Sequence, residues 1–138
     1  MGLVIDTNFF IDIENKRLSL TKLENYYEYG EVYISAITAS ELLMGVHLAD
    51  TIEKRIKRAA FVEGILAKIP VLDFNEKVAR SYAEIYAHFL KPRNKSATNV
   101  HDLQIASTAL AHGFPVLTNN VNDFNKVPGL IVLNPCDD

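Results

Sequence analysis

Short apolar runs alternate with longer amphipathic segments along the chain. The runs are rich in Val, Ile and Leu and cover residues 3–5, 32–34, 69–72, 115–117 and 130–133. Two segments between them place apolar residues at helical spacing: Ile56, Ala60, Ile65 and Ile69, and then Val78, Tyr82, Ile85, Tyr86 and Phe89. Strands that alternate with helices are typical of a parallel sheet covered on both faces. The pattern predicts an α/β fold with a mostly parallel five-stranded sheet and helices on both faces.

Glycine and proline residues mark the boundaries that this scheme requires. Gly30 precedes the second run, Gly113 and Pro115 precede the fourth, and Pro128 with Gly129 precedes the fifth. No repeat or low-complexity tract interrupts the 138 residues, of which 49% are hydrophobic. A chain of this length and composition can bury one core. We therefore expect one domain that spans residues 1–138.

The charge balance limits how the chain can contact nucleic acid. Lys and Arg total 14 and Asp and Glu total 17, which gives a formal net charge of −3. Such a chain does not bind phosphates by bulk attraction, so contacts must be local or made through a metal ion. Two basic groups are available: Lys54, Arg55, Lys57 and Arg58 on a predicted helix, and Lys91, Arg93 and Lys95 in a polar loop. We expect only the loop group to lie near a candidate site residue.

Other features bear on the compartment. The one cysteine, Cys136, has no partner in the chain, so a disulfide framework is excluded and a reducing compartment is favoured. The apolar N-terminal segment is interrupted by Asp6 and Asp12 and lacks a basic leader. The uncharged stretch 103–122 contains Gly, Pro and Asn residues that would be costly in lipid. We expect a cytoplasmic protein without a membrane span.

Two acidic residues in the first half follow predicted strands. Asp6 comes directly after the first strand, where parallel α/β sheets bind ligands. The alternative is that Asp6 only caps the following helix, since Asp is a favoured N-cap residue. Glu41 lies three residues after Thr38, which also fits a capping box in which Thr38 begins the helix and Glu41 reaches back. The local sequence leaves both alternatives open.

Two further acids lie in the second half. Asp102 falls in the first turn of a helix that Asn99 would cap, where the helix dipole favours a carboxylate. Asp123 lies in a polar loop after the fourth strand. Loops of this composition are often simple turns, and Asn119 or Asn120 could equally be the residue that faces a site.

The four acids gain significance from their joint placement at strand ends or helix starts, where they can converge. Clustered carboxylates repel one another, so the cluster either raises some of their pKa values or binds a cation. Oxygen ligands suit Mg²⁺ or Mn²⁺, and no group of Cys and His favours zinc. An ion there can activate water and neutralise charge on a leaving oxygen. The predicted reaction is phosphodiester hydrolysis.

The histidines and tyrosines give weaker signals. The four histidines are scattered and have no obvious orienting partner: His47, His88, His101 and His112. We expect His101, beside Asp102, to be a surface or capping residue. The cluster Tyr26, Tyr27 and Tyr29 fits either an interface or the packing of a helix.

Four segments together resemble the PIN-domain superfamily, specifically toxins of the VapC type. They are VIDTN, SELLMG, HDLQIASTALAHG and VLTNNVNDFNKVPGL, and the similarity covers nearly the whole chain. The resemblance implies a Mg²⁺- or Mn²⁺-dependent ribonuclease with Asp6, Glu41 and Asp102 as site residues. It implies Asp123 as the fourth acid, although some members place that acid where this chain has Asn119 and Asn120.

The resemblance also implies supporting residues and partners. Asn8, Thr118 and Asn120 are expected to hydrogen-bond the acids or their water. The partners implied are an RNA substrate, a VapB-type antitoxin and a second copy of the chain in a homodimer.

Two alternatives are a non-catalytic PIN-like module that binds protein or RNA, and a receiver-type domain with Asp6 as phosphoacceptor. The receiver reading requires a lysine after a later strand, whereas the fourth strand here ends in Thr and Asn.

Overall fold

The computed structural model describes residues 1–91 and 99–135, so Arg93, Lys95 and Cys136 lie outside the described residues. The strands are β1 (Gly2–Ile5), β2 (Glu31–Ser35), β3 (Val71–Leu72), β4 (Val116–Leu117) and β5 (Val132–Leu133). The helices are α1 (Thr7–Glu14), the 3₁₀ helix η1 (Leu20–Tyr29), α2 (Ala36–His47), α3 (Ile52–Lys68), α4 (Glu76–Leu90), α5 (Val100–His112) and α6 (Val121–Phe124).

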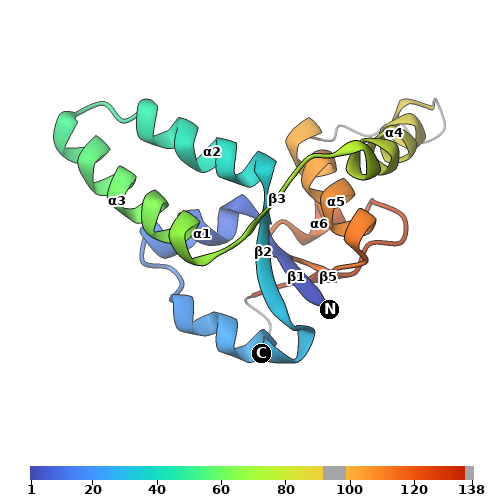
Figure 1. Cartoon of the computed structure of the whole chain (residues 1–138), viewed down its shortest axis with the longest axis horizontal. Coiled ribbons are helices and arrows are strands. Elements are labelled where there is room, and N and C mark those ends of the chain that lie inside the picture. The colour runs from blue at the N-terminus through green and yellow to red at the C-terminus, as the bar shows by residue number, and fades with distance from the viewer. Residues whose placement is uncertain (92–98, 136–138) are drawn as a thin grey trace.

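The five strands form one sheet in the order β3-β2-β1-β4-β5. Every neighbouring pair is parallel, with Val4 opposite both Tyr33 of β2 and Val116 of β4. The predicted α/β class and five-stranded sheet are therefore confirmed, and the sheet is parallel throughout. Figure 1 shows it near the centre of the molecule with helices to either side.

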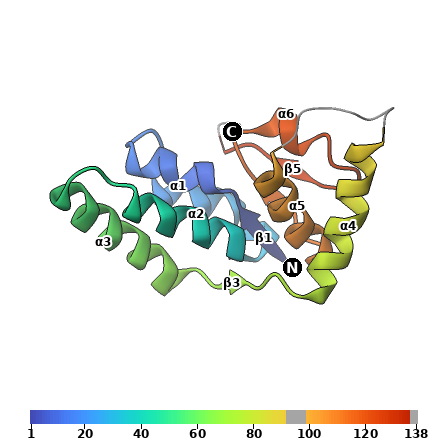
Figure 2. The same cartoon turned by 90° about the horizontal axis from the view of Figure 1, so that it is seen from above.

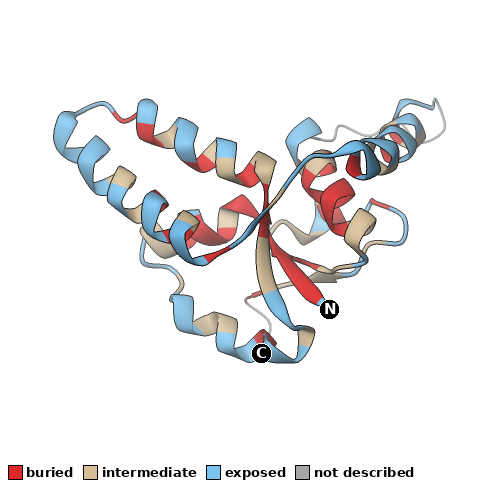
Figure 3. Cartoon of the chain, in the orientation of Figure 1, coloured by how far each residue is buried: buried red, intermediate tan, exposed pale blue. Residues whose placement is uncertain are grey.

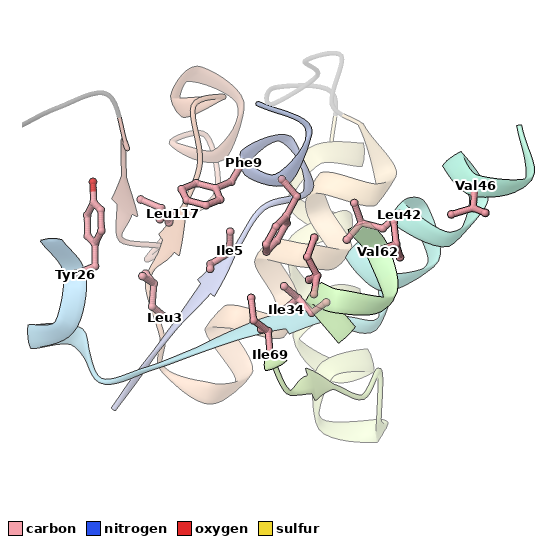
Figure 4. Packing of buried hydrophobic residues seen from close by; sticks show 12 residues of the cluster. Leu3, Ile5, Phe9, Tyr26, Ile34, Leu42, Val46, Val62, Ile69 and Leu117 are labelled. Atoms are coloured by element: carbon pink, nitrogen blue, oxygen red, sulfur yellow. The ribbon is translucent and has the colours of Figure 1, made fainter. Parts of the chain in front are cut away.

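Successive residues of β1 face opposite sides of the sheet, as the pleat requires. Leu3 and Ile5 pack in one cluster with α1, α2 and α3, whereas Val4 packs in a second cluster with α4, α5 and α6. Both views of the cartoon separate these two groups of helices (Figures 1 and 2). Figure 4 shows the first cluster, in which Phe9 and Leu117 lie beside the β1 side chains Leu3 and Ile5.

The prediction for the face of α3 was partly wrong. Ile56 is 64% exposed and Ala60 is exposed too, whereas the residues that α3 buries are Val62 and Ile65. Only the C-terminal half of the helix lies against the core, so its first turns carry an apolar residue in solvent (Figure 3). The third strand is also shorter than the apolar run, because Ile69 still donates its N–H to Ile65 at the end of α3.

The tyrosine cluster on η1 is divided between core and surface. Tyr26 is buried and donates its hydroxyl to the carbonyl of Asn134, and its ring packs beside Tyr29. Tyr27 is 73% exposed. Helix packing therefore accounts for Tyr26. Among the described residues, no helix is both long and apolar enough to cross a membrane.

Candidate active site

The strand order brings three chain segments to one edge of the sheet. β1 lies between β2 and β4, so the residues that follow these strands emerge side by side. The chain proceeds from β1 outward to β3 on one side and returns to β4 on the other, and ligands bind at such a reversal in open α/β sheets. Asp6 follows β1, α2 follows β2, and Thr118 follows β4.

All four candidate acids border one pocket of about 500 Å³ at this edge. Asp6 follows β1, and Glu41 lies in α2, which follows β2. Asp102 lies in α5 and Asp123 in α6. The charges of Asp102 and Glu41 raise the pKa of Asp6, and the charges of Asp123 and Glu41 raise the pKa of Asp102. The convergence expected from the sequence is therefore present.

Asp6 is 2% exposed and held from two directions. Its Oδ1 accepts from the backbone N–H of Thr7 at 2.8 Å, which caps α1, and its Oδ2 accepts from the Thr118 hydroxyl at 2.8 Å. Burial, with smaller contributions from the charges of Asp102 and Glu41, raises the pKa of Asp6 to about 7, although the two hydrogen bonds act to lower it. The cap and the site use the same side chain. Thr118, not a lysine, faces Asp6, which removes the support for a receiver-type phosphoacceptor.

Glu41 lies in the middle of α2, so the capping-box interpretation was wrong. The N-cap of α2 is Ser35, whose hydroxyl accepts from the Thr38 N–H at 3.0 Å. Glu41 is too far along the helix to reach that cap. Its Oε1 accepts from the Thr7 hydroxyl at 2.7 Å, and its Oε2 lies 3.3 Å from Nδ1 of His101.

The last two acids share one amide. Asn120 donates through Nδ2 to Asp102 at 3.2 Å and to Asp123 at 3.1 Å. Burial, together with the charges of Asp123 and Glu41, raises the pKa of Asp102 to about 6. Asn99 caps α5 as expected. Of the two asparagines left open by the sequence, Asn120 faces the site.

Other predicted residues are divided between the site and its surroundings. Asn119 turns away from the acids and donates to Asp12. Asn8 lines the pocket, but within residues 1–91 and 99–135 its side chain has no hydrogen bond to the four acids. Arg58 also lines the pocket, which contradicts the expectation that only the loop group lies near the site. Its guanidinium contacts Glu14 at 3.3 Å and the carbonyl of Gly45 at 3.1 Å.

The donor set fits a hard divalent cation in kind. It consists of carboxylate oxygens, and the neighbouring negative charges raise the pKa values of Asp6 and Asp102, so a cation nearby would be stabilised. In the part of the chain that the structure describes, no three His, Cys, Asp or Glu side chains are already gathered around one point as a metal site. Each acid is instead held by a neutral donor: Thr7, Thr118 or Asn120.

Sequence reasoning missed two residues that contact the acids. Thr7 is adjacent to Asp6 in the VIDTN segment, but its link to Glu41 joins residues far apart in the sequence. His101 is exposed, as expected, yet its ring also contacts Glu41. Its neighbour Asp102 was the available signal, because consecutive residues at the start of a helix can both reach the same pocket.

The fold and the pocket define an all-parallel α/β protein with an acidic site at the carboxyl ends of its strands. A family model described as the PIN domain matches residues 3–130. The chain is 40% identical to Ribonuclease VapC1 of Rickettsia felis over 133 residues, which cover 96% of both chains. It is 31% identical to the tRNA(fMet)-specific endonuclease VapC of Shigella flexneri over 128 residues, 92% of each chain.

A solved structure gives the same result. The chain matches VapBC2 of Rickettsia felis, crystallised with a DNA fragment of its promoter, with a TM-score of 0.86 and 26% identity, over 97% of this chain and 98% of that one. The chain belongs to the PIN domain family and, within it, to the VapC ribonuclease toxins. The family resemblance drawn from the sequence is thereby confirmed.

Proposed function

We propose that this chain is a Mg²⁺- or Mn²⁺-dependent endoribonuclease that hydrolyses phosphodiester bonds in RNA and acts as the toxin of a type II toxin–antitoxin system. The observation that carries the proposal is the meeting of four carboxylates from distant segments in one pocket, where two have strongly raised pKa values. Perturbed titratable groups in a cleft are typical of catalytic sites.

The proposed ligands of the metal are Asp6, Glu41, Asp102 and Asp123. When bound, such an ion supplies Lewis-acid chemistry, because it makes water a stronger nucleophile and offsets the negative charge of the phosphate. The protein's part is to hold the carboxylates in place. Thr118 fixes Asp6, and Asn120 keeps Asp102 and Asp123 beside each other.

The partners of related proteins support the rest of the proposal. Related structures include VapBC2 of Rickettsia felis and VapBC-5 of Mycobacterium tuberculosis, which is described as a member of the VapBC family of toxin–antitoxin systems. We infer that this chain binds a VapB-type antitoxin, forms a homodimer, and acts in the cytoplasm on an RNA substrate. We also infer that residues 1–138 form a single PIN domain.

The deciding experiment compares RNA cleavage by the wild type and by Asp6→Asn. We expect the wild type to cut RNA with added Mg²⁺ or Mn²⁺ and to stop when EDTA removes the metal. Asp6→Asn should remain folded and inactive, since it keeps the cap acceptor but loses a charge. RNA binding without cleavage by the wild type would favour the non-catalytic module. Sequencing the 5′ ends of the cut RNA would identify the substrate.

A further inference from the structure

A row of three buried hydroxyl groups leads from the start of α2 to the acidic pocket. The oxygens of Ser35 and Thr38 are 3.3 Å apart, and those of Thr38 and Thr7 are 3.1 Å apart. The Thr7 hydroxyl then reaches Oε1 of Glu41 at 2.7 Å. Ser35 and Thr38 are both 0% exposed, and Thr7 is 7% exposed. The row therefore lies in the protein interior and ends on a proposed catalytic acid.

The direction of donation along this row follows from its end. The Thr7 hydroxyl donates to Oε1 of Glu41, and a hydroxyl has only one proton to donate. Thr7 is then an acceptor for Thr38, and Thr38 is an acceptor for Ser35. Satisfying all three contacts therefore requires one arrangement of the protons. Hydrogen bonds aligned in this way polarise and strengthen one another in a dry interior.

Capping of α2 does not explain the Thr38 hydroxyl. The cap uses the backbone N–H of Thr38, which donates to Ser35 and would do so with any residue at position 38. An apolar side chain of the same size would avoid the cost of burying a hydroxyl group. The Thr38 hydroxyl contacts the Ser35 hydroxyl on one side and that of Thr7 on the other, and only the contact with Thr7 leads on to Glu41.

We propose that Thr38 is a positioning residue for the active site: its hydroxyl fixes Thr7, and Thr7 holds Glu41 in the pocket opposite His101. This inference rests on the proposed function, because it concerns the acid that would bind the metal. His101 contacts Oε2 of Glu41 from the other side, so the two carboxylate oxygens have separate partners. The row therefore limits the rotation of a side chain that α2 alone would leave free.

The test compares Thr38→Val, which keeps the shape and removes the hydroxyl, with Thr38→Ser, which keeps the hydroxyl. Thr108→Val is the matched control, because Thr108 is equally buried but donates to the Gln104 carbonyl within α5, away from the pocket. Loss of an outer partner of a metal ligand lowers metal affinity or activity by about 10- to 100-fold. We expect Thr38→Val to lower Mn²⁺ affinity, measured by calorimetry without RNA, and kcat by that factor, with KM unchanged.

Thr38→Ser should restore both quantities, and Thr108→Val should match the wild type in both while its midpoint of thermal unfolding falls about as far as that of Thr38→Val. Equal Mn²⁺ affinity and kcat in Thr38→Val and Thr108→Val would overturn the inference. A wild type that binds Mn²⁺ but cuts no RNA would contradict the proposed function, and the Mn²⁺ affinities of the variants would still decide the role of Thr38.

A second readout tests the row without metal or substrate. In the metal-free wild type, the hydroxyl proton of Thr7 should exchange slowly with water and give a resolved NMR signal, because it is buried and donated to Glu41. The signal should be lost in Thr38→Val and retained in Thr108→Val. A Thr7 hydroxyl that exchanges equally fast in the wild type and in Thr38→Val would show that the row does not hold it.

Discussion

At the scale of single residues, Asp6 shows why local sequence left two interpretations open. One carboxylate oxygen caps α1 through the Thr7 N–H, and the other accepts from Thr118 after β4. Capping requires a short acceptor at the end of the strand, and the site requires a carboxylate at the same place. Asp satisfies both requirements, so a sequence pattern for one cannot exclude the other.

The raised pKa of Asp6 makes stability depend on pH. Burial raises this pKa from 3.8 to about 7 in the folded state, so between pH 4 and 7 the folded protein holds a proton that the unfolded chain releases. The stabilisation that this proton gives the folded state is present in full below pH 4 and is lost as pH rises to about 7. Above pH 7 the effect of Asp6 on the free energy of unfolding is constant. Asp102, raised to about 6, acts in the same direction.

We therefore expect metal-free Asp6→Asn to be about as stable as the wild type at pH 4 and more stable by about 2 to 4 kcal/mol at pH 8. Loss of the hydrogen bond that Thr118 donates to Oδ2 reduces the gain, because the amide nitrogen at that place cannot accept it. Urea unfolding in EDTA across this pH range measures the difference. If the difference in free energy of unfolding between Asp6→Asn and the wild type stays constant or becomes smaller with rising pH, the Asp6 charge is not destabilising.

The neighbouring asparagines offer a matched pair of substitutions. Asn120→Ala removes the amide that joins Asp102 and Asp123, so we expect kcat to fall about 10-fold or more. Asn119→Ala instead leaves the buried carboxylate of Asp12 without that donor. We expect it to lower the free energy of unfolding by about 1 to 3 kcal/mol with little change in kcat.

Steady-state cleavage assays and urea unfolding of both variants separate the two roles. Equal losses of kcat in the two variants would contradict the assignment of Asn120 to the site.

At the scale of elements, the strands were easier to predict than the faces of the helices. Five short apolar runs correspond to five strands, because a parallel strand buried on both sides needs an unbroken apolar run. The face of α3 was misjudged at Ile56, which has helical spacing but lies beyond the part of the helix that meets the core. The start of α2 was misplaced because Ser35 and Thr38 are both good N-cap residues, and only the fold selects Ser35.

Arg58 joins three helices and gives a prediction at this scale. From α3 it contacts Glu14 at the end of α1 and the Gly45 carbonyl in α2. We expect Arg58→Ala to lower the free energy of unfolding by about 1 to 2 kcal/mol, partly through lost packing of its stem, since the partly exposed ion pair itself contributes little. Lys57→Ala on the same helix is the control, because the ion pair that Lys57 makes within the described part of the chain is with the exposed Glu53.

Thermal and urea unfolding of the two proteins should differ by that amount. Identical stability of the two variants would mean that Arg58 does not hold the three helices together.

At the scale of the whole molecule, the strand order determined what the sequence could reveal about the site. Asp6 follows a strand and Asp102 and Asp123 lie in the first turn of a helix, and the strand order brings these positions to one edge. Glu41 lies further along its helix and still reaches the same pocket. The partners of these acids could not be predicted. The contacts from Thr7 and His101 to Glu41 join residues from different elements, and they depend on the angle of α2 to α1 and α5. Local patterns contain no information on those angles.

Metal binding provides a prediction for the molecule as a whole. Near pH 6 Asp102 is about half protonated and Asp6 mostly so, whereas a bound ion requires both as carboxylates. Binding of Mn²⁺ at pH 6 should therefore release more than one proton, and the release should fall toward zero at pH 8.5, where both groups are already ionised. Affinity should rise over the same interval. Calorimetry in two buffers of different ionisation enthalpy counts the protons.

Asp6→Asn is the control, since it leaves Asp102 as the main source of protons and should shift the release to lower pH. A proton count that does not change between pH 6 and 8.5 would place Mn²⁺ away from these acids. Because any ligand that prefers the folded state stabilises it, Mn²⁺ should also raise the midpoint of thermal unfolding of the wild type, and by more at pH 8 than at pH 6. The pH dependence of this rise comes from the same charges that destabilise the metal-free protein. In Asp6→Asn, the destabilisation of the metal-free protein and the pH dependence of the Mn²⁺ effect should therefore both be smaller.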